Sequence, residues 1–252
     1  MITRKSRQEI DRMRRAGRLV AEVLALVESE LRAGVTTGHL DQLAEKHIRA
    51  AGATPSFKGY GDRRNPFPAS LCISIDDEVV HGIPGGRPIK DGQIVSVDAG
   101  AIVEGWHGDG ARTFLVGAHP PEAEKLVETT RRAMMAGIAA AVPGARIGDI
   151  SAAIEDVAMP GGYGIVRQFV GHGIGTEMHE DPQVPNYRAG PKGTQLAAGM
   201  CLAIEPMLTL GGHEVAVKPD GWTIVTRDGS LAAHFEHTIA ITDNGPEILT
   251  TV

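Results

Sequence analysis

The N-terminal part of the chain has a hydrophobic pattern that predicts two helices. Between residues 10 and 31, apolar side chains recur three and four positions apart, so they lie along one stripe of a helix. Ser6 and Glu9 have the spacing of a capping box at the start of this helix, and Gly34 is expected to end it. A second helix with the same type of stripe is predicted over residues 37–48.

The rest of the chain alternates predicted strands with a further pair of helices. Strands are predicted where short β-branched runs are bounded by Gly, Pro or Asp, at 71–75, 78–81, 94–100, 113–116, 165–170, 200–205, 223–226 and 238–242. The two helices, over 120–142 and 147–158, separate the first four strands from the last four. This order of elements indicates a mixed α/β protein.

The two parts of the chain also share short sequence features. Residues 34–40 match residues 144–150 in two glycines and an apolar position, at an offset of 110. Residues 92–98 match residues 199–205, because each segment is an apolar run that ends in an acid six positions after a glycine. Chance similarity between amphipathic segments is the alternative to a duplication. We predict a single domain, 1–252, made of two related halves, about 6–117 and 118–252.

Composition and charge place the chain among ordinary globular proteins. It has 252 residues, of which 42% are hydrophobic and 22% charged, and its net charge of -6 argues against a nucleic-acid-binding surface. The basic residues among the first 18 have helical spacing, which predicts a solvated helix face. We expect no signal peptide and no membrane span, and therefore a cytoplasmic protein that binds neither DNA nor membranes. A monomer is the expected oligomeric state.

Two acids follow apolar runs in a way that predicts metal ligands. Asp98 ends the run 94–97 and Glu205 ends the run 200–204, and both runs are typical of strands buried on two faces. An ionised carboxylate there must meet a cation, several donors, or solvent at a strand end, and for a lone acid solvent is the commonest solution. A second acid follows each of the first pair, namely Asp109 and Glu236. Four acids in two matched pairs favour two divalent cations, held roughly 3.5–4 Å apart.

A histidine between glycines is a candidate fifth ligand. His172 lies in the segment Gly171–Gly175, directly after an apolar run, and the glycines allow a ligand to approach closely. One imidazole among carboxylates suits Mn(II), Fe(II), Co(II) or Zn(II). Taken alone, however, such a histidine is more often structural.

Other chemistries fit the sequence less well. His179-Glu180 begins like the helical zinc-protease motif, but Gln183 stands where that motif needs its second histidine and Pro182 would break the helix. The sequence has neither a Gly-x-Ser-x-Gly elbow nor a phosphate-binding loop. The only cysteines, Cys72 and Cys201, lie in β-branched runs and are expected to be buried and unreactive.

Six motifs together resemble those of type I methionine aminopeptidases, in that family's order and spacing and over nearly the whole chain. They are Ser74–Pro84, Val97–Gly100, His107–Asp109, Gly171–Gly175, Ile204–Met207 and the segment from Asp220 to Thr238. The resemblance implies the pita-bread fold, an α/β fold with a pseudo-two-fold axis and a curved, mainly antiparallel sheet covered by helices. It implies an enzyme that hydrolytically removes the initiator methionine from nascent polypeptides and prefers a small second residue.

The resemblance also implies the site residues and the cofactor. The cofactor would be two divalent ions (Co, Mn, Fe(II) or Zn), and the metal ligands would be Asp98, Asp109, His172, Glu205 and Glu236. Glu205 would also transfer a proton, and His81 and His179 would assist catalysis by contacting the substrate. The substrate pocket would comprise Tyr60, Phe67, Cys72, His81, Met178, His179 and Trp222. A transient ribosome contact through the basic N-terminal helix is left open.

The sequence departs from the usual family pattern at a few positions. Met178 stands where an aromatic residue is usual, Ala203 where threonine is common and His234 where glutamine is usual, and the segment 61–68 is longer than expected. The nearest rivals are prolidases and Xaa-Pro aminopeptidases, which share the five ligands but usually carry an extra N-terminal domain. The rival of another class is a binding protein on this fold that has lost catalysis.

Overall fold

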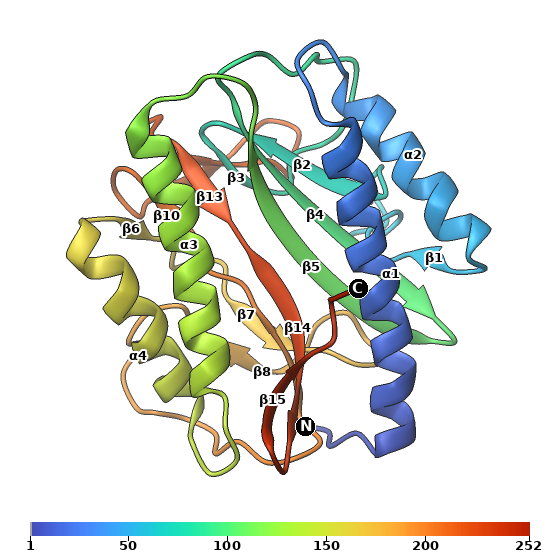
Figure 1. Cartoon of the computed structure of the whole chain (residues 1–252), viewed down its shortest axis with the longest axis vertical. Helices are drawn as coiled ribbons and strands as arrows, with labels where there is room; N and C mark the ends of the chain where they lie inside the picture. Colours follow the sequence, from blue (N-terminus) through green and yellow to red (C-terminus); the bar gives the residue numbers. More distant parts are fainter. Residues whose placement is uncertain (1) are drawn as a thin grey trace.

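The structure is a computed structural model that describes residues 2–252, so Met1, the first residue of the predicted domain, lies outside the described residues. Its α-helices are α1 (Arg7–Glu30), α2 (Thr37–Ala50), α3 (Pro121–Ala140) and α4 (Ile147–Ala158), with a 3-10 turn at Met159–Gly161. Figure 1 shows α1 and α2 at the right of the view and α3 and α4 at the left, with strands of the main sheet visible between the two pairs. None of the helices within residues 2–252 is long and apolar enough to cross a bilayer.

The main sheet is antiparallel throughout its described pairings, as expected for the predicted fold. Its strands lie in the order β1 (Thr54–Pro55), β4 (Ile94–Val103), β5 (Trp106–Leu115), β14 (Glu236–Thr242), β9 (Cys201–Ile204), β7 (Gly171–Gly173) and β8 (Glu180–Val184). Two more strands join from the side: β2 (Leu71–Ile75) pairs with β4, and β15 (Gly245–Ile248) pairs with β14. The centre of the sheet therefore combines strands from both parts of the chain.

Two small sheets complete the structure. One has the order β13 (Ala232–His234), β10 (Met207–Thr209) and β6 (Gly164–Ile165), and the other β11 (Val215–Val217), β12 (Ile224–Thr226) and β3 (Glu78–Val80). The second sheet joins a short N-terminal strand to a C-terminal hairpin. It thereby ties together segments that are far apart in the sequence.

The start of α1 is as the sequence predicts. Ser6 Oγ accepts the Glu9 N–H, and the Glu9 carboxylate accepts the Ser6 N–H, so the capping box is complete. The helix crosses β5 at close range, because a Cβ atom on Gly108 would lie 2.6 Å from the backbone nitrogen of Gly17. Only glycine permits this approach. The contact fixes the backbone of β5 one residue before Asp109.

The helices cover two separate apolar clusters. One cluster packs α1 and α2 on β2 and β4 through residues such as Leu24, Leu40 and Ile73, all nearly or fully buried. The other packs α3 and α4 on β9 and β14 through residues such as Leu126 and Ile239. This pairing of helices with strands agrees with the expected fold class. The derivation of the two halves from one ancestral unit stays a prediction.

Two local predictions were wrong, and one alternative left open for Asp98 is excluded. Residues 165–170 were expected to form one strand, but only Gly164–Ile165 pairs, because the following residues leave the sheet to line a cavity. Asp98 lies in the middle of β4 and not at its end, so solvent at a strand end cannot accommodate it. Lys5 does not belong to a solvated basic face, because it is buried and forms a 2.6 Å ion pair with Glu180.

Candidate metal centre and substrate pocket

Strand register brings three of the predicted metal ligands together around one small residue. Ala111 on β5 lies opposite both Asp98 on β4 and Glu236 on β14. Asp109 is two residues before Ala111, so its side chain points to the same face of the sheet. The alanine methyl leaves room for the three carboxylates that surround it.

The other two predicted ligands reach the same face from the next strands. His172 on β7 lies opposite Ala203 on β9, and Glu205 follows Ala203 by two residues. Ligand atoms of Asp109, His172 and Glu236 all lie within 4.8 Å of one another. His172 Nε2 is 3.4 Å from Glu205 Oε1. The five side chains therefore meet in one place although they come from four strands and the residue after a strand.

The hydrogen bonding of His172 fixes which of its nitrogens is free. Its Nδ1 lies 2.9 Å from the carbonyl oxygen of Gly173, which can only accept, so Nδ1 carries the proton. Burial lowers the pKa of His172 to about 3, so the ring is neutral and Nε2 is an unprotonated lone pair. That lone pair faces a carboxylate oxygen of Glu205. Two acceptors in such contact call for a cation beside them.

Several carboxylate oxygens at this place also lack donors. Asp98 Oδ1, Asp109 Oδ1 and Glu236 Oε1 are buried and make no hydrogen bond within residues 2–252. Buried polar atoms without partners are costly and rare in native proteins. Carboxylates with one neutral imidazole form a donor set that divalent Mn, Fe, Co or Zn accepts. The residues present therefore fit a divalent metal ion.

The electrostatics of the metal-free cluster point in the same direction. Burial raises the pKa of Asp98 to about 7. Burial, together with the charges of the neighbouring acids, raises the pKa values of Asp109, Glu205 and Glu236 well above the usual range. The cluster therefore retains protons near neutral pH unless cations replace them.

All twelve residues predicted for the site line one cavity of about 280 Å³. His81 and His179 lie at this cavity beside the carboxylates. His81 is held in a left-handed conformation with φ 59, and its ring meets Phe169 edge-on at 5.5 Å. His179 is hydrogen bonded through Nδ1 to the Tyr60 hydroxyl at 2.6 Å, and its ring is 4.3 Å from that of His172. Burial lowers the pKa of His81 to about 4 and also lowers that of His179, so both rings are neutral at pH 7.

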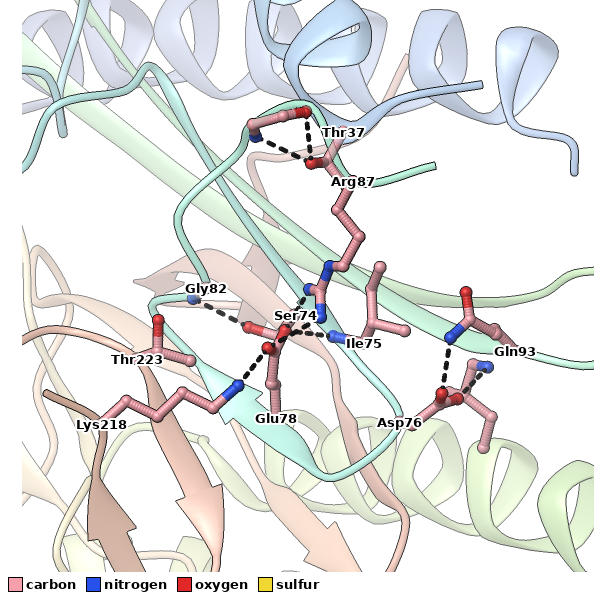
Figure 2. Close-up of polar contacts among 12 residues, drawn as sticks. Thr37, Ser74, Ile75, Asp76, Glu78, Gly82, Arg87, Gln93, Lys218 and Thr223 are labelled. Carbon is pink, nitrogen blue, oxygen red and sulfur yellow. Dashed lines mark hydrogen bonds and ion pairs between the residues drawn. The ribbon is translucent and has the colours of Figure 1, made fainter. Parts of the chain in front are cut away.

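An ionic network centred on the buried carboxylate of Glu78 supports the turn that carries His81. Figure 2 shows Glu78 between Arg87 and Lys218. Arg87 donates two hydrogen bonds to the Glu78 carboxylate, at 3.0 and 2.6 Å, and Lys218 donates a third at 2.7 Å. Burial disfavours the charge on Glu78, but these donors and the Ile75 N–H outweigh it and lower its pKa. The network thereby links the turn that carries the strained backbone of His81 to Lys218, which comes from the C-terminal part of the chain.

An apolar wall closes the other side of the cavity. Phe67, Cys72 and Met178 belong to one buried cluster, and Trp222 packs edge-on against Phe67 with the ring centres 5.2 Å apart. Burial raises the pKa of the Cys72 thiol well above its usual value, so it is not a thiolate nucleophile. Met178 has 5% of its surface exposed, which makes it part of the wall rather than of the mouth.

Six other residues line the cavity and were not predicted as site residues: Phe57, Val80, Phe169, Val170, Met207 and His234. His234 was noted only as a departure from the family pattern, although it directly precedes the pair Phe235-Glu236, and Val80 directly precedes His81. Phe169 and Val170 were assigned to a strand. Phe57 carried no signal, because it lies outside the predicted helices and strands and outside the six motifs.

The comparisons with known proteins agree with this geometry. The sequence model of metallopeptidase family M24 matches residues 11–243. A methionine aminopeptidase of Clostridium acetobutylicum is 52% identical, and the match covers 99% of each chain. The crystal structure of a methionine aminopeptidase from Thermotoga maritima has a TM-score of 0.96 and 44% identity, and the match covers all of both chains.

A more distant structure shows the fold alone. The prolidase of Pyrococcus horikoshii OT3 has a TM-score of 0.80 at 24% identity, and the match covers 99% of this chain but 63% of that one. The match to C. acetobutylicum, by contrast, extends over both chains at twice that identity. The chain belongs to metallopeptidase family M24 and, within it, to the methionine aminopeptidases.

Proposed function

We propose that this protein removes N-terminal methionine from nascent polypeptides, with two divalent ions and a preference for a small second residue. One observation carries the proposal. His172 Nε2 lies 3.4 Å from Glu205 Oε1, in a cavity whose opposite wall is apolar. A ligand set and a pocket for an unbranched side chain thus share one space. The names of the relatives supply the substrate class.

The ligand assignment follows from charge and from unpaired atoms. When the four carboxylates of the cluster are ionised they carry four negative charges, which two divalent ions would neutralise in place of the protons that their raised pKa values retain. We assign Asp98, Asp109, His172, Glu205 and Glu236 as the ligands, with Asp109 and Glu236 shared between the ions. Bound ions of this kind lower the pKa of water and polarise a carbonyl group. Cobalt, manganese, iron(II) and zinc all suit this donor set.

The chain's own residues would handle the protons. Glu205 has one oxygen beside the ligand cluster and one directed elsewhere in the cavity, so it can take a proton on one side and release it on the other. His81 and His179 are neutral and can donate hydrogen bonds to the oxygen of the scissile bond as it gains charge. The Tyr60 hydroxyl orients the His179 ring for that purpose.

The pocket walls would select methionine by shape. Phe67, Cys72, Met178 and Trp222 offer apolar surface for a thioether side chain. Such a pocket discriminates by about 1–3 kcal/mol per methylene, so slow cleavage of norleucine peptides is expected. The second residue of the substrate would meet the narrow space beside Tyr60 and His179, which favours small side chains.

The charges on the outer face of α1 bear on the setting of the activity. We expect a cytoplasmic monomer that acts on nascent chains. Arg12, Arg15 and Arg18 lie on the outer face of α1, but Glu104 and Glu22 pair with them. This partial neutralisation argues for a weak and transient ribosome contact at most.

The test is a peptidase assay with two substrates. Wild type should release methionine from Met-Ala-Ser, lose this activity with a chelator, regain it with Mn(II) or Co(II), and leave an Xaa-Pro peptide largely uncut. Glu205→Gln should lose at least about a hundredfold in kcat. Glu247→Gln, a surface acid paired with Arg14, is the matched control and should keep full activity. Preferential Xaa-Pro cleavage would support the prolidase alternative, and chelator-resistant activity would reject the metal centre.

A further inference from the structure

One buried nitrogen in the cavity has no partner and no assigned role. His234 is 2% exposed and lies at the end of β13, and its Nε2 makes no hydrogen bond within residues 2–252. A buried ring nitrogen that donates to nothing is unfavourable and calls for an explanation. The same ring lines the cavity that holds the five proposed ligands.

The backbone of His234 is fixed from two directions. Its strand position lies opposite Met207 on β10. Thr113 Oγ1 on β5 accepts the His234 N–H at 2.9 Å and donates to the His234 carbonyl at 2.7 Å. Ser96 Oγ is hydrogen bonded to the same hydroxyl at 2.8 Å. The backbone is therefore held in place, and the burial of the ring restricts its rotation away from the cavity.

Glu205 is the group that the unpartnered nitrogen faces. The two oxygens of this carboxylate lie between two imidazoles, with Oε1 3.4 Å from His172 Nε2 and Oε2 3.9 Å from His234 Nε2. The Glu205 backbone is also held, because Asn186 Nδ2 donates to its carbonyl at 3.1 Å. Rotation about the side-chain bonds of Glu205 is therefore the main motion that can change this contact.

The two imidazoles differ in what they can offer Glu205. His172 presents a lone pair, since its proton is used at Nδ1. For His234, a lone pair directed at the carboxylate would be repulsive, whereas an N–H at Nε2 would find an acceptor. The separation of 3.9 Å is longer than a hydrogen bond, and contacts of this type shorten when a site is loaded.

We propose that His234 is a positioning residue for Glu205, whose Oε2 accepts the Nε2–H of His234 when the metal site is loaded. The hydrogen bond fixes the plane of the carboxylate, so that Oε1 stays beside His172 as a ligand. Outer hydrogen bonds of this kind commonly set both the orientation and the affinity of a ligand. This inference rests on the proposed metal-dependent function of the same cavity.

The test compares variants of His234 with a partly buried histidine of the same region. His234→Met removes the donor and leaves an adaptable apolar side chain, and His234→Gln restores an N–H donor. His237→Leu is the control: His237 is partly buried, lies three residues away and is hydrogen bonded to Thr250, outside the cavity. The full metal-free chain is titrated with Mn(II) by calorimetry, and the visible spectrum of the Co(II) form reports ligand geometry. Circular dichroism confirms folding, and His234→Leu replaces the methionine variant if that one does not fold.

The expected result is a loss of about 10–100-fold in Mn(II) affinity for His234→Met, with an altered Co(II) spectrum. His234→Gln should recover most of the affinity, and His237→Leu should lower only the unfolding temperature. Wild-type affinity in His234→Met, or equal losses in His234→Met and His237→Leu, would overturn the inference but leave the proposed function intact. Failure of glutamine to rescue would also overturn it, because a donor would then not be what matters. If wild type itself binds no Mn(II), both proposals fail.

Discussion

Asp109 and Thr238 exchange two hydrogen bonds at the centre of the sheet. Thr238 Oγ1 accepts the Asp109 N–H at 3.0 Å and donates to the Asp109 carbonyl at 2.8 Å. The hydroxyl thereby continues the pairing of β5 with β14 beyond the pair Gly110 and His237. Both residues are buried, with Thr238 completely so. One side chain thus fixes the backbone of a proposed metal ligand.

Replacement of Thr238 by valine should therefore affect stability and metal binding together. Val has the same shape but leaves the Asp109 N–H and carbonyl buried without partners, at a cost of about 2–4 kcal/mol for the two groups. Urea unfolding measures this cost, and calorimetry should show weaker Mn(II) binding. Thr238→Ser keeps the hydroxyl and should recover most of the unfolding free energy and most of the Mn(II) affinity.

A second buried threonine provides the control for that experiment. Thr226 Oγ1 donates to the Ser230 carbonyl at 2.8 Å, away from the cavity. Thr226→Val should cost about 1 kcal/mol of unfolding free energy and leave Mn(II) affinity unchanged. An unaltered metal affinity in Thr238→Val would show that the contact matters only for folding.

The metal-free protein should become less stable as the pH rises from about 6.5 to 8. Asp98 has a folded pKa of about 7, above the unfolded value of about 3.9, and the other three acids are raised further. Their stabilising contribution is complete below the unfolded pKa and is lost as the pH rises through the folded pKa. Buried histidines with lowered pKa values oppose this trend only below about pH 6.5, where the unfolded chain gains protons.

Thermal unfolding in excess chelator measures this trend. The midpoint should fall between pH 6.5 and 8, and added Mn(II) should raise it most at pH 8, where protons compete least. Asp98→Asn should stabilise the metal-free protein at pH 8 because it removes one charge from the cluster. A flat or rising midpoint of the chelated wild type over this interval would contradict the raised pKa values.

Local patterns in the sequence were sufficient for most of the framework. The α1 stripe, its capping box and the strand Leu71–Ile75 were all predicted correctly, because each depends on neighbouring residues. The length of β4 was not, since the strand continues to Val103, three residues past the predicted end at residue 100. Beyond that predicted end, β4 is held by pairing with β5 on one side and with β1 on the other.

The sequence predicted the site residues that lie in recognisable motifs, but not those that only the tertiary structure brings to the cavity. Asp98, Glu205 and His172 follow recognisable apolar runs, Asp109 and Glu236 come after the first two acids, and the structure gathers all five into one cavity. Phe169 looked like part of a buried strand, because burial in a cavity wall and burial in a sheet leave the same apolar signature. The contact between His234 and Glu205 joins residues with no common local pattern. Contacts between segments that are distant in the sequence therefore account for most of the site features that were not predicted.

The Glu78 network predicts an ordered series of variants. Glu78→Gln should be the most harmful, because it removes the negative charge between two cations and replaces one of the two acceptor oxygens with an NH2 donor. Arg87→Met loses two hydrogen bonds and should follow, and Lys218→Met loses one and should cost about 1 kcal/mol or less, since Lys218 is partly exposed. We expect kcat for Met-Ala-Ser to fall in the same order, because the turn that carries His81 loosens.

Two measurements separate positioning from simple stabilisation in that series. Urea unfolding gives the stability loss, and kcat and KM are measured well below the unfolding midpoint. Arg188→Met, which breaks a pair with Glu155 on the far side of α4, is the control and should leave kcat unchanged. If kcat stays constant across the Glu78 series, the network serves only the fold.

Met178 should determine which side chains the pocket admits. It packs with Phe67 and Cys72 in a wall of the cavity, so Met178→Ala opens space where the substrate's first side chain is proposed to lie. The loss of contacts with methionine should lower kcat/KM for Met-Ala-Ser by about 1–3 kcal/mol in activation free energy. The added space should at the same time admit Phe-Ala-Ser, so the preference for Met over Phe should fall at least tenfold, or about 1.4 kcal/mol. A competition assay with both peptides measures this ratio directly.

Met135→Ala, on an exposed face of α3, is the control and should leave the ratio unchanged. An unchanged ratio in Met178→Ala would place the methionine side chain elsewhere in the cavity.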